Sequence, residues 1–344
     1  MLTKRRIGLL AVALLFAKTA AAFSLYNAGA TKEAPSGAGE LTAAVAPGSK
    51  ITNAKGSCLS LSGLKNALIE NVVIGPCGGH GIELHDSHNV VIRNVVIEDT
   101  QESGILIAGS TAVDVLESRI SRTISGVYAL NSKTLNVSCN TIVSPRGPIP
   151  RGQFVQFDKV TGSDNRIRCN SGHNEPGQGE PEDAISLYQS HGTAQSPITV
   201  ADNLIVGGGP SESGGGIMLG DSGGSYQVAT RNVLVDPGQY GIAVSSGHDL
   251  SILDNVVYAR RQPFTNVGIY TWNQYDPKCH SIRVEGNEVK WISKTGAPNP
   301  FWDGENCGVI KGEHKNNFAA KLTADLAERK PVEAQCSCKS EGWR

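Results

Sequence analysis

The chain has 344 residues, of which 39% are hydrophobic and 18% charged, and its formal net charge is −1. This length and composition suit one large soluble domain or two small ones. The near-neutral balance gives no electrostatic basis for binding nucleic acid or an anionic membrane surface.

The N-terminus has the order of a secretory signal. Lys4, Arg5 and Arg6 precede the apolar run IGLLAVALLFA, and the small residues TAAA follow. This order predicts a signal peptide over residues 1–22, cleaved near Ala22. The run is too short to cross a bilayer, and no later segment approaches the roughly 20 apolar residues of a span. We expect a secreted or periplasmic protein, and a retained membrane anchor is the alternative.

A glycine-apolar signal then recurs every 22 to 32 residues. Between its copies lie stretches in which Asn alternates with Val and Ile, such as IRNVVI and ILDNVVY. Short strands at such a period indicate a solenoid in which each turn buries its apolar side against the next. We expect the Asn to stack at a corner and to bond to the backbone of the adjacent turn. The signal begins at Gly81, Gly104, Gly126, Phe154, Ala184, Gly216, Gly241 and Gly268.

This pattern resembles the right-handed parallel β-helix proteins of the pectin-lyase-like superfamily, over residues 51–292. The resemblance implies an all-β, right-handed parallel β-helix solenoid. It implies no single activity, because the superfamily includes lyases, hydrolases, epimerases and non-catalytic solenoids. Residues 23–50 are expected to form an N-terminal cap, and residues 293–344 a C-terminal cap. Within the latter, NNFAAKLTADLAERK has the spacing of a short helix that covers the open end.

The eight cysteines are disulfide candidates because an oxidising compartment preserves such bonds. Cys58 and Cys77 flank the start of the repeats, and we expect them and a C-terminal group to staple the two ends. Cys139 and Cys169 each precede an Asn, which places them in one column on neighbouring turns. A zinc site is the competing interpretation of the C-terminal group, but it lacks paired CxxC units. That group is Cys279, Cys307, Cys336 and Cys338.

The middle repeats are longer than the others. Steps of 28, 30 and 32 residues contain the insertions SPRGPIPRG, SGHNEPGQGEPE and GGGPSESGG. Loops on consecutive turns build walls around one stretch of surface, so this pattern predicts a substrate groove. The alternative is that exposed loops simply tolerate insertion.

Strand alternation predicts which residues face this groove. Residues one and three places after the start of each signal point inward, and those two and four places after it point outward. Asp158, Asp183 and Asp221 then fall on three consecutive turns, and Asp158 and Asp221 should be roughly 10 Å apart along the backbone. Inverting glycosidases separate their carboxyl groups by about 6.5 to 9.5 Å. We therefore predict catalytic carboxylates at these positions and at Glu182; solvated turn residues are the alternative.

Outward aromatic side chains in the same region suit sugar rings, whose C–H faces match aromatic faces. Packing beneath the loops is the alternative role. The predicted substrate-binding residues of the outward columns are Gln156, Tyr128, Tyr188, Tyr270 and Trp272.

The stretch EDAISL looks like one turn of the polygalacturonases in this superfamily. Those enzymes carry Asn-Thr-Asp-Gly, Asp-Asp, Gly-His-Gly and Arg-Ile-Lys on successive turns. Here Glu182 and Asp183 match the Asp-Asp pair. Gly215 occupies the His place, Gln153 stands where the preceding Asp would be, and the Arg-Ile-Lys turn has no basic residue. These departures leave that particular activity without its complete motif.

Two other functions stay open. A lyase or uronan epimerase needs a base and a cation that neutralises the sugar carboxylate, with Ca²⁺ held by Glu180, Glu182 or Asp183 as a further option. Pectate-lyase arginine signatures and the Asp-Pro-His motif of mannuronan epimerases are absent. A non-catalytic carbohydrate-binding or periplasmic accessory solenoid would be expected to have uniform turns. We therefore favour a secreted polysaccharide-cleaving hydrolase that requires no cofactor. The lyase candidates are Tyr188, His191, Lys159 and Arg151.

Overall fold

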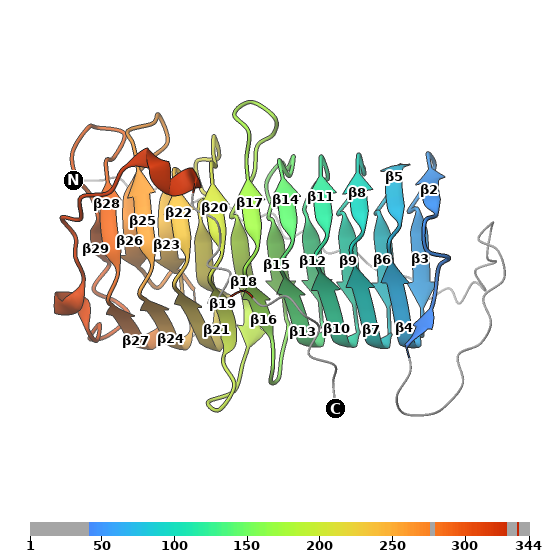
Figure 1. The fold of residues 1–344 in the computed structure, drawn as a ribbon. Coiled ribbons are helices and arrows are strands. Elements are labelled where there is room, and N and C mark those ends of the chain that lie inside the picture. The colour runs from blue at the N-terminus through green and yellow to red at the C-terminus, as the bar shows by residue number, and fades with distance from the viewer. Residues whose placement is uncertain (1–40, 276–278, 329–335, 337–344) are drawn as a thin grey trace. The chain divides into compact units, whose positions relative to one another are not determined.

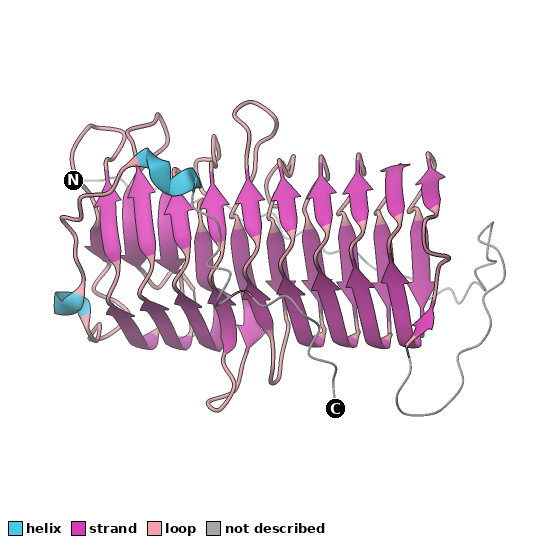
Figure 2. Cartoon of the chain, in the orientation of Figure 1, coloured by secondary structure: helices cyan, strands magenta, loops and turns pink. Residues whose placement is uncertain are grey.

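The computed structural model describes residues 41–275, 279–328 and 336. In these ranges almost all regular structure is short parallel strand (Figures 1 and 2). The predicted signal peptide lies outside them. None of the helices in the described ranges has the length and apolar character needed to cross a bilayer.

Each turn of the chain contributes one strand to each of three rows, and every strand pairs in parallel with its equivalent on the next turn. The all-β parallel solenoid expected from the repeat is thereby confirmed. Because β21 runs through both the first and the second row, these two rows form one 19-stranded sheet, and the third row forms a 10-stranded sheet.

The first row is β3 (Leu59–Ser62), β6 (Ile82–His85), β9 (Ile105–Ala108), β12 (Val127–Leu130), β15 (Val155–Asp158), β18 (Ile185–His191), β21 (Ile217–Thr230), β23 (Tyr240–Val244), β26 (Val267–Thr271) and β29 (Phe301–Asp303). The second row is β1 (Thr42–Ala43), β4 (Lys65–Glu70), β7 (His88–Arg93), β10 (Thr111–Leu116), β13 (Lys133–Ser138), β16 (Arg166–Arg168), β19 (Ile198–Ala201), β24 (His248–Leu253) and β27 (His280–Glu285). The third row is β2 (Lys50–Asn53), β5 (Val73–Cys77), β8 (Val96–Glu98), β11 (Arg119–Ser121), β14 (Thr141–Val143), β17 (Ser171–His173), β20 (Leu204–Val206), β22 (Val233–Val235), β25 (Val256–Ala259) and β28 (Glu288–Trp291).

Close approach between turns explains the repeated glycine. A Cβ atom on Gly241 would lie 2.4 Å from both the Gly268 carbonyl oxygen and Val257 Cγ1, which no larger residue can tolerate. Phe154 occupies the equivalent place in a middle turn, and its ring enters the core where Gly172 leaves room. Gly172, which has no side chain, therefore makes room for the large Phe154 that replaces the usual glycine.

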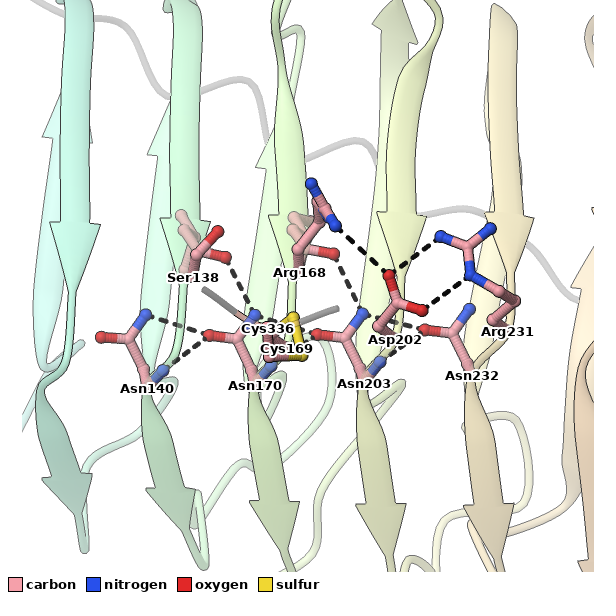
Figure 3. Close-up of a disulfide and its surroundings, with 12 residues drawn as sticks. Ser138, Asn140, Arg168, Cys169, Asn170, Asp202, Asn203, Arg231, Asn232 and Cys336 are labelled. Atoms are coloured by element: carbon pink, nitrogen blue, oxygen red, sulfur yellow. Dashed lines mark hydrogen bonds and ion pairs between the residues drawn. A yellow bond between two sulfur atoms is a disulfide. The ribbon is translucent and has the colours of Figure 1, made fainter. Parts of the chain in front are cut away.

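A ladder of buried asparagines lines one corner of the solenoid, as predicted (Figure 3). The side-chain amide nitrogen of Asn203, Nδ2, donates to Ile167 O and to Asn232 Oδ1, both at 2.9 Å. On the first turns the prediction was wrong, because Asn71 and Asn94 do not join this ladder. Each stands one residue before the ladder position, with positive φ of 55° and 49°. The ladder consists of the buried Asn140, Asn170, Asn203, Asn232, Asn255 and Asn287 and, at its end, the partly buried Asn316.

Disulfides close the beginning and the end of the solenoid, as the cysteine positions predicted. Cys58 is bonded to Cys77 beside the first complete turn, and Cys279 is bonded to Cys307 near the last one. Each bond joins segments of neighbouring turns.

A third disulfide ties the C-terminal segment to the middle of the solenoid. Cys336 is bonded to Cys169, which follows β16 (Figure 3), so the C-terminal cysteines do not all pair among themselves. Cys139 is also disulfide-bonded and lies in the column of Cys169 on the preceding turn. Cys338 lies outside the described residues.

The helix expected in the C-terminal cap forms only a 3-10 helix, η2 (Ala324–Glu328), and it does not cover the open end. Leu322 and Leu326 instead pack against Val235 and Tyr258 on the flank of the third row, as Figure 1 shows for η2 beside β22. The outer side of that row carries an apolar patch, so burying it outweighs covering the end.

Other residues pack against the ends of the core. Ala44 and Val45 contact it near the first turn. At the last turn Phe318 stacks on Phe301 with ring centroids 5.2 Å apart, and η1 (Glu313–Lys315) lies next to β27.

Candidate functional site

A groove with a cavity volume of about 1050 Å³ lies over the middle and later strands of the first row. Two of the three predicted loops contribute walls, through Pro150 and Arg151 and through Glu212 and Ser213. From the other insertion only Glu182 lines the groove, and most of the remaining insertion lines a separate cavity of about 700 Å³. Figure 2 shows this insertion as the long loop beyond β17.

Two carboxylates share one outward column of the groove. Asp158 on β15 is paired with Tyr188 on β18, which is paired with Asp221 on β21. Strict alternation along β21 would place Gly220 opposite Tyr188. A bulge between the Ser186 and Tyr188 pairings shifts the register by one residue, so Asp221 lies opposite Tyr188 instead. The backbone positions of Asp158 and Asp221 are therefore two strand spacings apart, or about 10 Å across the sheet.

Asp183 is buried on the same turn as Tyr188, two residues before β18 begins. Its Oδ1 accepts a hydrogen bond from the Gly215 amide at 3.1 Å and another from the Tyr240 hydroxyl. A Cβ atom on Gly215 would come within 2.7 Å of the Tyr240 ring, so this glycine lets the tyrosine reach the acid. Burial raises the pKa of Asp183 well above its usual value, and the nearby charges of Asp221 and Glu182 raise it further.

Asp221 is a second carboxyl group with a perturbed proton affinity. Burial raises its pKa to about 6, although the Ser186 hydroxyl donates to its Oδ2 at 3.0 Å and acts in the opposite direction. The charges of Glu182 and Asp158 add to the increase. Two neighbouring acids in one groove thus hold protons at a pH where carboxyl groups are ordinarily ionised.

Glu182 fixes a wall of the groove. Its two carboxylate oxygens accept hydrogen bonds from Ser211 Oγ and Ser213 Oγ, both at 2.7 Å, which tie the third insertion to this turn. Of the three predicted calcium ligands, Glu180 does not line the groove but lines the second cavity. No group of three acidic, histidine or cysteine side chains suited to a metal ion occurs within the described ranges.

Asp158 is contacted by a tyrosine hydroxyl and by a lysine. The Tyr128 hydroxyl donates to Asp158 Oδ2 at 2.7 Å, and Lys159 Nζ lies 3.5 Å from Oδ1. The Arg151 guanidinium covers the Tyr128 ring at 4.4 Å, and Lys159 lies 5.7 Å from the Tyr188 ring. Tyr128 itself does not line the groove; it contacts Asp158 from the preceding turn.

His191 does not belong to this site. The backbone turns at Gln189, which has a φ of 45°, and His191 emerges in the second row. There its side chain is exposed, and Nδ1 lies 3.0 Å from Ser225 Oγ. His191 was predicted because it lies near Tyr188 in the sequence, but the bend carries it away from the groove. All the other predicted substrate-binding residues except Tyr128 line the groove: Arg151, Gln156, Lys159, Tyr188, Tyr270 and Trp272.

Three further aromatic residues went unpredicted. Tyr240 stands directly before a repeat signal, in the same column as Asp183, and this shared position was the available clue. Tyr275 and Trp302 line the groove near its C-terminal end. Trp302 is paired with Tyr270, but it lies on a turn beyond the last recognisable repeat signal.

The chain belongs to the right-handed β-helix family. The family model described as "Right handed beta helix region" matches residues 43–142 and 103–289, which together exceed half of the chain. This match confirms the superfamily resemblance and the handedness that the repeat predicted. A search of curated proteins found no match to the chain.

Several solved structures are similar to this fold. The catalytic domain of a GH87 α-1,3-glucanase in complex with nigerose aligns with 11% identity and a TM-score of 0.49, covering 81% of this chain and 61% of that one. The periplasmic alginate epimerase AlgG aligns with 13% identity and a TM-score of 0.41, covering 79% and 78%. A mannuronic acid specific polysaccharide family 6 lyase from human gut microbiota aligns with 14% identity and a TM-score of 0.43, covering 75% and 62%. The chain thus spans less than two thirds of the glucanase domain and of the lyase.

Proposed function

We propose that this protein is a secreted or periplasmic enzyme that hydrolyses glycosidic bonds of a polysaccharide bound in the groove. One observation carries the proposal: Asp183 is a buried acid, hydrogen-bonded to Tyr240, beside the second perturbed acid Asp221. Neighbouring carboxyl groups with separated roles are the machinery of glycoside hydrolysis. The disulfides of the described chain suit the same oxidising compartment.

The two acids divide the chemistry by their proton affinity. Asp183, whose pKa is the more strongly raised, keeps its proton and donates it to the oxygen of the leaving sugar as the C–O bond breaks. Asp221, with a pKa of about 6, is ionised at neutral pH and removes a proton from the water that attacks the anomeric carbon. The charge of Asp158 stabilises the positive character that develops on the sugar ring.

A product assay tests this proposal. The purified protein is incubated with α-glucans, β-glucans, alginate and polygalacturonate, and reducing ends and absorbance near 235 nm are recorded. We expect new reducing ends without absorbance, and Asp183→Asn should lower the rate at least about 100-fold. Asp164→Asn makes the same chemical change at an exposed side chain and serves as the control. Full activity of Asp183→Asn would show that the acid is wrongly assigned.

A second candidate, β-elimination or epimerisation of a uronic-acid polymer, has support at one end of the groove. Arg151 and Lys159 line the groove there and would provide the cations, and Tyr188, next to Lys159, the base that such chemistry needs. Absorbance near 235 nm would identify a lyase, and changed sugar configuration without cleavage would identify an epimerase. Binding without any product would leave a non-catalytic solenoid as the best interpretation.

A further inference from the structure

The described residues include three strongly exposed aromatic side chains, and all three lie in the groove. Trp272, Tyr275 and Trp302 are 43%, 42% and 45% exposed. We call these three residues the aromatic platform. The two indole rings meet edge to face with centroids 5.9 Å apart. Large aromatic rings gathered on one exposed surface are typical of a binding site.

The platform is held in place before any ligand binds. Asn273, next to Trp272, donates its amide hydrogen to Asn306 Oδ1 at 2.7 Å, and Asn306 Nδ2 donates back to Asn273 O at 3.0 Å. Gly304 stands where a Cβ atom would come within 2.8 Å of the Trp272 ring. Because the surrounding backbone is already fixed, little conformational entropy remains to be lost on binding.

Trp302 forms the end of the platform that is remote from the proposed acids, whereas Tyr275 lies near enough for the charges of Asp221 and Asp183 to raise its pKa. Strand register leads from β21, which carries Asp221, through β23 and β26 to Trp302 on β29. Three strand spacings amount to about 14 Å, which exceeds the length of one sugar ring. A chain cleaved beside Asp221 therefore reaches Trp302 through sugars that are not themselves attacked.

The groove changes in charge between its two ends. All its charged lining residues belong to the turns up to β21 and the loops that precede it. From Gln239 onward, the described lining consists of aromatic, hydroxyl, amide and apolar groups, with amides at Asn266, Gln274 and Asn299. Amides can exchange hydrogen bonds with sugar hydroxyls, whereas a sugar carboxylate would lose water there without gaining a cation.

We propose that the aromatic platform and its neighbouring amides form a subsite for neutral sugars, a few units from the bond that is cleaved. This inference rests on the proposed function and specifies its substrate class: a neutral polysaccharide, bound along the axis of the solenoid. Stacking supplies affinity through the C–H faces of the sugar rings, and the amides recognise the hydroxyls.

Binding measurements on an inactive background test the subsite apart from catalysis. Asp183→Asn protein is titrated with dextran, laminarin and galactomannan and with polygalacturonate. The titrations are repeated with Trp272→Ala, Trp302→Ala or both added. We expect a neutral polymer to bind more tightly than polygalacturonate, and each tryptophan substitution to weaken binding up to about ten-fold. Val309→Ala, which truncates an apolar side chain that is 86% exposed outside the groove, is the control.

In the active enzyme, the tryptophan substitutions should lower kcat/KM for the long polymer by a larger factor than kcat/KM for a disaccharide-derived substrate. The subsite is refuted if no neutral polymer binds, if polygalacturonate binds best, or if the tryptophan variants bind like the parent. Neutral polymer that binds through the tryptophans but is never cleaved would instead refute the proposed hydrolysis and leave the subsite standing.

Discussion

Replacing Asp221 by Asn should stabilise the folded protein, and the gain should depend on pH in a defined way. The folded-state pKa of Asp221 is about 6, whereas its ordinary value is 3.8. Below pH 3.8 both states carry the proton, so the carboxyl group brings no penalty. Between these values the unfolded chain releases its proton more readily than the folded protein, and stability falls as pH rises. Above about pH 6 the penalty is complete.

The size of this effect follows from the shift. About two pKa units at 1.36 kcal/mol each give about 3 kcal/mol. The amide that replaces the Asp221 carboxyl group keeps an oxygen that accepts the Ser186 hydroxyl, so the packing of the site is retained.

The assay is the free energy of unfolding in urea, measured from about pH 3.5 to 8 for the wild type, Asp221→Asn and the exposed control Asp164→Asn. The difference between Asp221→Asn and wild type should be near zero at the acid end and rise to about 3 kcal/mol above about pH 6. A difference that is independent of pH, or one that grows toward acid pH, would refute the reasoning.

Three further predictions concern other parts of the molecule. Tyr240→Phe removes a hydrogen bond that favours the charged form of Asp183, so the alkaline limb of the kcat/KM profile should move to higher pH; a move to lower pH would contradict the assigned acid. Asn203→Ala should lower the free energy of unfolding in urea by roughly 3 kcal/mol because it orphans buried partners on both adjacent turns, whereas Asn94→Gly in the exposed column should cost less. His191→Ala should leave polysaccharide cleavage unchanged, since its side chain is exposed outside the groove.

The solenoid was predictable because its causes are local and repeated. Gly241 and its equivalents sit where two turns approach too closely for a side chain, and this constraint recurs on nearly every turn. The buried asparagine ladder recurs for the same kind of reason. Even the exception at Phe154 is answered within the same turn, by Gly172. The fold could therefore be predicted from sequence patterns that repeat once per turn.

The site was only partly predictable because its decisive contacts do not repeat. Tyr240 reaches Asp183 across 57 residues of sequence, through space left by Gly215. The bulge that moves Asp221 opposite Tyr188 interrupts the period that the prediction relied on. Alternation located the right strands and faces, but the proton affinities depend on burial and on neighbouring charges, which belong to the assembled turns.

These features link activity and stability in the proposed mechanism. Burial and mutual repulsion allow Asp183 to hold a proton at neutral pH, and the same forces make folding less favourable at every pH where the unfolded chain has released that proton. A neutral isostere at this position should therefore abolish cleavage while making the protein more stable at neutral and alkaline pH. A residue whose role was only structural would show the opposite, because replacing it would cost stability. Loss of activity together with a gain in stability thus distinguishes a catalytic acid from a packing residue.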